Sequence, residues 1–175
     1  MARISLVESD AAPPEVKEIY EKVLKGKPGS VQKAMAQRPE ALKNFLSFYA
    51  SVGRALDRKL YEEIYIRVSW LNGCNYCLQH HVASSKRVGL GAEDWKALKE
   101  GAYSRFGEKD QAALTYAEKL TRASKAVSDA DITALKKHFT DAEVVDIHLL
   151  VGLVNFTNRF TDPLGLEVEF PQEPI

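Results

Sequence analysis

Apolar residues recur three or four positions apart along most of this chain, and the alternation typical of a half-buried strand is almost absent. Glycine and proline interrupt the helical pattern at Gly26, Pro39, Gly73 and Gly89. A chain of 175 residues can bury one good core but is short for two full domains. The sequence therefore predicts an all-α fold in a single compact domain, residues 1–175.

The segments between these breaks are predicted helices. They cover residues 13–26, both sides of Arg38-Pro39, 58–71, 74–88, a short stretch around Trp95, 109–126, 129–137 and 141–160. Asp57 is a predicted N-cap for the fourth of them. Residues 1–12 are expected to form an extended arm, 35–165 the helical core that carries the cysteines, and 161–175 an extended C-terminal tail.

Charge and hydropathy exclude several kinds of partner. Acidic and basic residues number 24 each and are interleaved, so no basic stripe for nucleic acid is present. The first residues lack the apolar region of a signal peptide. The most apolar run, from Ile147, is far shorter than the ~20 residues of a membrane span. We expect a cytoplasmic protein that binds neither nucleic acid nor membrane.

Residues 147–157 are apolar on nearly every side of the predicted last helix. Such a helix lies either in the core or in a subunit interface, and the pattern allows both. We expect it to contribute to self-association.

The chain has two cysteines, Cys74 and Cys77, in the stretch NGCNYCLQHH. A disulfide between them would close a loop of four residues, for which the loss of unfolded-state entropy is smallest. A structural crosslink therefore explains the pair poorly. Thiol reactivity or metal binding explains it better.

Cys74, Cys77 and His81 fall within about 60° of one another on a helix. Free N–H groups at the helix start stabilise a thiolate, which favours Cys74 as the reactive thiol. His81 lies four residues after Cys77 and can exchange its proton, which favours Cys77.

Glu62 is a predicted fourth member of this group. If the helices before and after Asn72-Gly73 form an antiparallel hairpin, Glu62 lies level with residue 83, about one turn or less from His81. A carboxylate there would orient the imidazole and stabilise its charged form. Glu63 is expected to face solvent on the other side.

Other polar residues give weaker signals. His138 and His148 are expected on helix surfaces or at the edge of the core, each with a hydrogen-bond partner. Asn158 and Arg159 could help shape a pocket.

Two other interpretations of the cysteines remain open. Both thiols could be ordinary buried side chains, because free cysteine behaves as a small hydrophobe. Zinc could bind Cys74, Cys77 and His81 with either His80 or Glu62, although no second cysteine pair exists. Haem attachment is excluded because Leu78 follows Cys77 where histidine is required.

The order Glu62, eleven residues, Cys74, two residues, Cys77, three residues, His81 resembles a known pattern. It is similar to that of the alkylhydroperoxidase D-like branch of the carboxymuconolactone decarboxylase superfamily. The flanking text SWLNGCNYCLQHHVASSKRVGL and the ending NFTNRFTDPLGLE resemble that superfamily's uncharacterised peroxidase-related proteins. The likeness covers residues 35–165.

The resemblance implies an all-helical trimer or hexamer that reduces organic hydroperoxides without a metal or organic cofactor. Cys77 would become the sulfenic acid, Cys74 would be the proton donor and resolving thiol, and His81 and Glu62 would relay the proton. A dithiol or lipoylated protein would be the reductant. Tyr76 departs from the family pattern, which has a histidine before the second cysteine.

Two further functions are compatible with the sequence. One is a lactone decarboxylase, as the superfamily name suggests, although that chemistry does not need a cysteine pair. The other is a non-catalytic thiol redox sensor whose disulfide changes its assembly.

Overall fold

The structure, a computed structural model, describes residues 2–175, and this part of the chain is helical with no strand. The predicted all-α fold is confirmed. The α-helices are α1 Pro14–Lys22, α2 Ser30–Met35, α3 Pro39–Ala55, α4 Arg58–Asn72, α5 Asn75–Ser85, α6 Ala92–Glu100, α7 Glu108–Ala123, α8 Asp129–Leu135 and α9 Asp141–Thr161. Short 3₁₀ turns are η1 Lys86–Val88, η2 Tyr103–Arg105 and η3 Ser124–Ala126.

The hairpin of α4 and α5 begins and ends where its sequence signals lie. The Asp57 carboxylate accepts hydrogen bonds from the backbone N–H groups of Lys59 (3.0 Å) and Leu60 (3.1 Å), which caps α4. Gly73 ends the helix with a φ of 71°, a left-handed conformation that glycine adopts without steric cost. Cys74 follows as the N-cap of α5.

Three predicted helices end three or four residues earlier than expected. The first ends at Lys22, four residues before Gly26. The predicted helices 74–88 and 109–126 change to 3₁₀ geometry in their last turns, at η1 and η3. Tightened final turns are common because they satisfy carbonyl groups that have no partner at a helix end.

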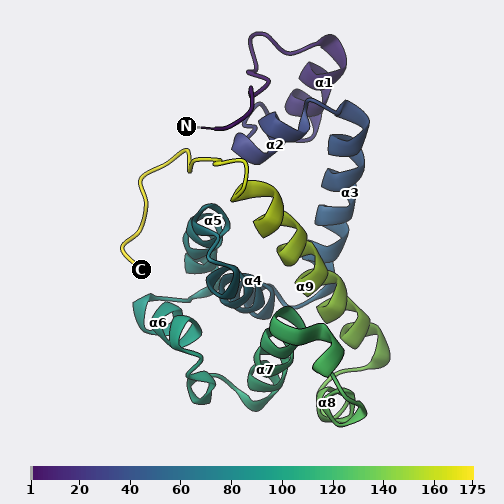
Figure 1. Ribbon diagram of the computed structural model, residues 1–175, viewed down its shortest axis with the longest axis vertical. Coiled ribbons are helices and arrows are strands. Elements are labelled where there is room, and N and C mark those ends of the chain that lie inside the picture. The colour runs from purple at the N-terminus through teal and green to yellow at the C-terminus, as the bar shows by residue number, and fades with distance from the viewer. Residues whose placement is uncertain (1) are drawn as a thin grey trace.

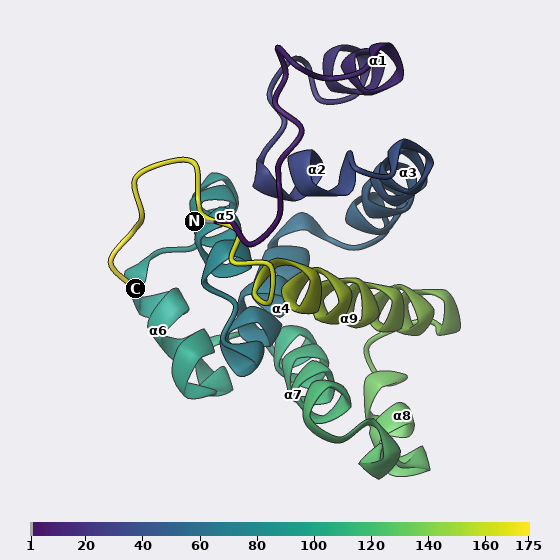
Figure 2. The ribbon, with the colours of Figure 1, turned by 45° about the horizontal axis from the view of Figure 1, so that its top comes forward.

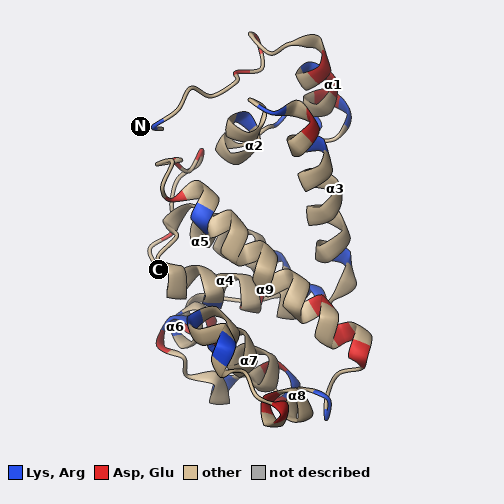
Figure 3. Cartoon of the chain, turned by 45° about the vertical axis from the view of Figure 1, so that its right-hand side comes forward, with Lys and Arg blue, Asp and Glu red and all other residues tan. Residues whose placement is uncertain are grey.

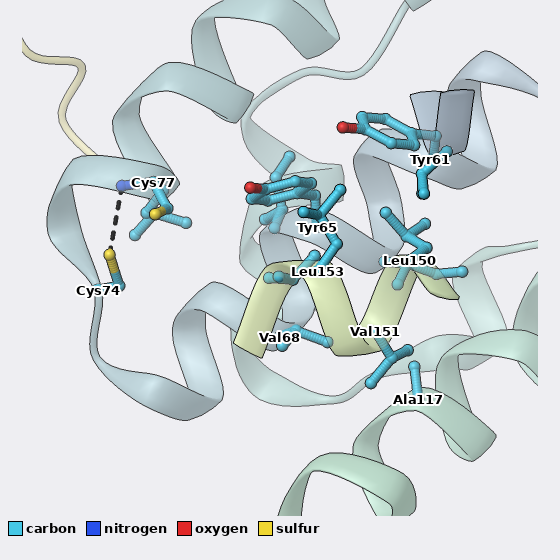
Figure 4. Close-up of a cluster of buried hydrophobic side chains, with 14 of the residues drawn as sticks. Tyr61, Tyr65, Val68, Cys74, Cys77, Ala117, Leu150, Val151 and Leu153 are labelled. Atoms are coloured by element: carbon cyan, nitrogen blue, oxygen red, sulfur yellow. Dashed lines mark hydrogen bonds between the residues drawn. The ribbon is translucent and has the colours of Figure 1, made fainter. Parts of the chain in front are cut away.

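Helix α4 lies at the centre of the molecule and packs against α5, α7 and α9 (Figure 1). All its residues from Leu60 to Ser69 are buried. Aromatic and aliphatic side chains of α4 and α9 form the adjoining core, and Cys77 lies beside it (Figure 4). Each such side chain stabilises the fold by about 1.5–3 kcal/mol on burial. The α4–α5 hairpin is therefore held on a rigid base.

Helices α1 and α2 lie at one end of the molecule, beside α3, and the N-terminal arm runs from there back toward the residues that follow α9 (Figure 2). The arm is held by backbone hydrogen bonds from Val7 N–H to the Lys33 carbonyl (3.1 Å) and from Arg3 N–H to the Leu164 carbonyl (2.8 Å). Lys, Arg, Asp and Glu are mixed over the elements (Figure 3). No helix within residues 2–175 combines the length and apolar character that crossing a membrane requires.

The C-terminal tail is extended, as predicted, and residues 167–173, here called the strap, lie along α5. Gln79 and Glu173 exchange two hydrogen bonds, from Gln79 Nε2 to the Glu173 carbonyl (3.0 Å) and from Glu173 N–H to Gln79 Oε1 (2.8 Å). Asn75 Nδ2 donates to Gln172 Oε1 at 3.0 Å. The strap thus belongs to the wall around the cysteine helix, which the sequence did not predict.

Candidate functional site

Cys74 and Cys77 are free thiols at the start of α5. The Cys74 sulfur accepts a hydrogen bond from the Cys77 backbone N–H at 3.4 Å (Figure 4). Thr161, at the end of α9, places its hydroxyl 2.9 Å from Cys74 Sγ and 3.5 Å from Cys77 Sγ. Both thiols are almost fully buried, with exposed fractions of 1% and 4%.

The pKa values of the two thiols are shifted in opposite directions. A hydrogen bond from the Cys77 thiol lowers the pKa of Cys74 despite burial, and the Thr161 hydroxyl and the Cys77 N–H add to this effect. The hydrogen bond to Cys74 and burial raise the pKa of Cys77. Because the thiols interact closely, the first proton lost belongs to the pair rather than to one sulfur. The pair can therefore hold one negative charge, favoured at Cys74 in the resting state.

Glu62 and His81 meet across the hairpin. Glu62 Oε2 is 2.6 Å from His81 Nδ1, and Glu62 Oε1 accepts from Ser84 Oγ at 2.7 Å. Arg58, one turn before Glu62, lies 2.6 Å from the same Oε1. The hairpin therefore brings together residues 19 positions apart, at the level that the turn position predicts.

The pKa values at this contact describe an ionised carboxylate and a neutral imidazole. Burial tends to raise the pKa of Glu62, but hydrogen bonds from His81 and Ser84 and the charge of Arg58 outweigh it and lower the pKa. Burial lowers the pKa of His81, and the opposing effect of Glu62 is smaller. Neutral His81 therefore carries its proton on Nδ1, toward Glu62, and offers a lone pair at Nε2.

Two tyrosines fix the His81 ring. Tyr65 stacks on it with ring centroids 3.3 Å apart and planes 10° apart. The Tyr65 hydroxyl is 2.7 Å from Thr157 Oγ1, which holds that ring in turn. The Tyr49 hydroxyl, from α3, is 3.3 Å from His81 Nε2. The imidazole is thus held at both nitrogens and on one face.

A cavity of about 450 Å³ opens onto Cys77 and His81. Cys77 lines it, whereas Cys74 does not. Its other walls combine aromatic and aliphatic side chains with several polar ones. These wall residues are Val31, Phe45, Leu46, Tyr49, Tyr65, Tyr76, Thr157, Lys27, Gln32, His80 and Glu169, with Pro28 and Gly29. Walls that combine apolar side chains with some polar groups are typical of small-molecule sites.

Glu169 of the strap closes one side of this cavity. Its carboxylate accepts hydrogen bonds from the Tyr76 hydroxyl (2.8 Å), from His80 Nε2 (2.9 Å) and from the Ser30 backbone N–H. Burial tends to raise the pKa of Glu169, but these bonds outweigh it and lower the pKa. Tyr76, where the family pattern has histidine, therefore helps to anchor the strap.

The weaker polar predictions have mixed outcomes. His148 lies at the edge of the core with its Nε2 2.6 Å from the Tyr116 hydroxyl, as expected. His138 is partly exposed. Asn158 and Arg159 do not line the cavity. Asn158 is buried, donates from Nδ2 to Ser69 Oγ (3.2 Å) and accepts from Asn72 Nδ2 (2.8 Å), whereas Arg159 is exposed and donates to Asn155 Oδ1.

The prediction that Glu63 faces solvent is wrong, because its exposed fraction is 0%. Helix α4 is covered on every side, so both neighbouring glutamates are buried. Lys59, one turn earlier, pairs with Glu63 Oε1, and Glu63 Oε2 has no hydrogen-bond partner among the described residues. Burial raises the pKa of Glu63 to about 7, although Lys59 opposes this shift.

We expect Glu63→Gln to stabilise the protein at pH 8. The folded carboxyl holds its proton up to about pH 7, whereas the unfolded carboxyl loses it near pH 4.5. Stability from this group is therefore present below pH 4.5 and is lost as the pH rises to 7. The variant removes that loss, on the order of 1–3 kcal/mol. Melting temperatures of the wild type and the variant at pH 5 and pH 8 measure this difference in stability. Glu21→Gln, at an exposed position, is the control. If the melting temperatures of wild type and Glu63→Gln depend on pH in the same way, the prediction is wrong.

The zinc interpretation requires a group of ligands that lie close together. Among residues 2–175, no three His, Cys, Asp or Glu side chains converge as a metal site requires.

A family model and a related protein each match part of this chain. Residues 39–119 match the model of the carboxymuconolactone decarboxylase family. The uncharacterized protein YdfG of Bacillus subtilis (strain 168) is 28% identical over 113 residues, which cover 63% of this chain and 77% of that protein.

Solved structures share the fold over nearly the whole chain. An uncharacterized peroxidase-related protein from Silicibacter sp. TM1040 is 27% identical with a TM-score of 0.82, covering 95% of this chain and 91% of that one. A protein from Ralstonia eutropha JMP134, described as an alkylhydroperoxidase AhpD core and peroxidase-related, is 24% identical with a TM-score of 0.82 and coverages of 96% and 92%. The debrominase Bmp8, in complex with 2,3,4-tribromopyrrole, has a TM-score of 0.78 at 17% identity and coverages of 97% and 94%.

Proposed function

We propose that this chain is a thiol-dependent peroxidase of the alkylhydroperoxidase D/carboxymuconolactone decarboxylase superfamily, and that it reduces organic hydroperoxides. One observation carries the proposal. Two free thiols share a helix start, but only Cys77 lines the cavity, where it is joined by His81. A hydroperoxide that enters the cavity therefore reaches the thiol that has a base one helical turn away.

The reaction uses both sulfurs in sequence. The Cys77 thiolate attacks the distal peroxide oxygen, the O–O bond breaks, and the alkoxide takes a proton to leave as an alcohol. Cys74 then attacks the Cys77 sulfenic acid, which forms the disulfide and releases water. An external dithiol, free or carried on a lipoylated protein, reduces the disulfide and is itself oxidised. These steps need no metal or organic cofactor.

The surroundings of the thiols suit these roles. The pKa of Cys74 is lowered, so Cys74 readily loses its proton and can attack the Cys77 sulfenic acid as a thiolate. Glu62 can stabilise a positive charge on His81, because the carboxylate is buried and only 2.6 Å away. The walls formed by Phe45, Leu46 and Tyr65 suit a hydroperoxide with an apolar body.

A turnover assay tests the proposal. We expect cumene hydroperoxide to be consumed over many cycles when dihydrolipoamide is supplied, with the oxidised dithiol formed in equal amount. One equivalent consumed without turnover would favour a redox sensor. Conversion of a muconolactone without peroxide consumption would favour the decarboxylase.

We also propose that the protein is a homo-oligomer, as trimer or hexamer, and that α9 supplies a contact. Val145, Leu149 and Phe156 on α9 are exposed by 55%, 41% and 51%. With Gly152 they follow a spacing of four, three and four residues, which is that of a helix–helix seam. Nothing lies within 4 Å of a Cβ built on Gly152, so a second helix has room to approach there. Charged residues of α9 lie toward its ends (Figure 3).

We expect Leu149→Glu and Phe156→Glu each to produce monomers, because a second copy would bury the new charge without a partner. Light scattering at micromolar concentration gives the mass directly. Val23→Glu, which changes an apolar residue of similar exposure (55%) beyond the end of α1, is the control and should leave the mass unchanged. A strictly monomeric wild type would contradict the proposal.

A further inference from the structure

We propose that Tyr49 is a further catalytic residue, which carries the proton between the cavity and His81. For its peroxide step this inference rests on the proposed function. Two observations carry it: the Tyr49 hydroxyl is 3.3 Å from His81 Nε2, and the same residue lines the cavity beside Cys77. No feature of the cysteine motif points to it, because Tyr49 comes from α3.

The hydrogen-bond pattern sets the direction of the Tyr49 contact. His81 carries its proton on Nδ1, where the Glu62 carboxylate accepts it at 2.6 Å. The Nε2 lone pair therefore accepts the Tyr49 O–H. The phenolic oxygen keeps its own lone pairs, which can accept a proton from a group in the cavity.

Tyr49 is thus bonded to the base and lines the same cavity as the thiol. His81 Nε2 is already bonded to Tyr49, so a direct transfer from Cys77 would have to displace the phenol. Burial raises the pKa of Tyr49, and the negative charge of Glu62 adds to this shift. The phenol therefore stays protonated at neutral pH. It acts by accepting a proton from one neighbour while it donates its own proton to the other.

The transfer is balanced in both directions. From the state in which both thiols are protonated, Cys77 gives its proton to the Tyr49 oxygen while the Tyr49 hydroxyl proton moves to His81 Nε2, which leaves a Cys77 thiolate and an imidazolium beside Glu62. When the thiolate attacks the peroxide, the imidazolium returns its Nε2 proton to Tyr49, and Tyr49 gives its proton to the leaving alkoxide. Tyr49 and His81 end in their starting states.

The test uses Tyr49→Phe, which keeps the ring that packs on Phe45 with centroids 5.7 Å apart and removes only the hydroxyl. Tyr116→Phe is the matched control. It removes another tyrosine–histidine hydrogen bond, 2.6 Å long to His148 Nε2, away from the cavity.

The first measurement does not depend on peroxide chemistry. Iodoacetamide alkylation of Cys77 is followed by peptide mass spectrometry from pH 5 to 10. In Tyr49→Phe we expect the rate at pH 7 to fall roughly tenfold and the midpoint of the pH profile to rise by about one unit. Tyr116→Phe should match the wild type. An unchanged profile in Tyr49→Phe, with the fold intact by circular dichroism, would overturn the relay.

The second measurement is the imidazole ¹⁵N spectrum of His81, in which Tyr49→Phe should shift Nε2 and leave Nδ1 nearly unchanged. An unshifted Nε2 would overturn the hydrogen bond on which the relay depends. The proposed function is tested separately. If the alkylation profile shifts but the wild type consumes no peroxide, the relay stands and the peroxidase fails. If peroxide is consumed equally by both proteins, the peroxidase stands and the relay fails.

Discussion

Cys77→Ser is expected to abolish peroxide turnover, with a loss of roughly a thousandfold or more, as for removal of other essential nucleophiles. Cys77 is the sulfur that lines the cavity, and a serine hydroxyl cannot replace a thiolate as a two-electron reductant. Cys74→Ser should also stop turnover, but after the first oxidation rather than before it. The sulfenic acid at Cys77 then accumulates because the resolving thiol is gone.

The measurement is mass spectrometry after one equivalent of hydroperoxide, with a 1,3-diketone that traps sulfenic acids. We expect the adduct on Cys77 in Cys74→Ser and no adduct in Cys77→Ser. Cys74 provides a sharp comparison because its pKa is lowered although it does not line the cavity. An adduct on Cys74 would show that acidity, rather than access, selects the reactive sulfur.

Both variants should fold. Serine is a favoured N-cap residue, so Cys74→Ser keeps an acceptor at the start of α5 and should change stability by no more than about 1 kcal/mol. Thermal unfolding checks this. If neither thiol of the wild type reacts faster than free cysteine, the pair is not activated. The two cysteines are then ordinary buried side chains or part of a redox sensor.

The hairpin at the centre of the site could be predicted because its signals are local. Asp57 caps the first helix of the hairpin, and Asn72-Gly73 ends it. The rise per residue of a helix then gives the height of each residue along both helices. This arithmetic placed Glu62 level with residue 83, and the carboxylate contacts His81 and Ser84 on either side of that position.

What surrounds the hairpin could not be predicted, because it depends on packing between distant segments. Tyr49 comes from α3 and Glu169 from the strap, and no periodic pattern relates either to the cysteines. The error at Glu63 has a related cause. The helical pattern predicts a buried and an exposed face for this helix, but α4 is central and covered on all sides. Arg58 and Lys59, each one turn before a glutamate, were the available signal that both carboxylates are paired.

Glu62→Gln is expected to slow sulfenic acid formation at Cys77 by about a hundredfold. Glutamine has nearly the same shape and keeps an oxygen that can accept from Ser84 or His81, but it removes the negative charge that stabilises the imidazolium. Protons then leave the thiol pair less readily. Stopped-flow measurement of the first oxidation, across the pH range, isolates this step from reduction of the disulfide.

Glu63→Gln is the matched control, since it makes the same change at the next residue of the same buried helix. The two carboxyl groups have pKa shifts of opposite sign, lowered for Glu62 and raised for Glu63. The ionised form of Glu62 contributes stability that is present above the unfolded pKa and is lost as the pH falls through the folded one. Glu62→Gln should therefore weaken the fold at neutral pH, whereas Glu63→Gln should strengthen it.

The two variants together distinguish a role of Glu62 in proton transfer from a role of α4 in supporting the fold. If α4 only supports the fold, the rate of oxidation should follow stability, and Glu63→Gln should be at least as fast as the wild type. If Glu62 also stabilises the imidazolium, Glu62→Gln should stay slow even under conditions where it is fully folded. A hundredfold loss in both variants would remove Glu62 from the relay, because Glu63 pairs with Lys59 rather than with His81.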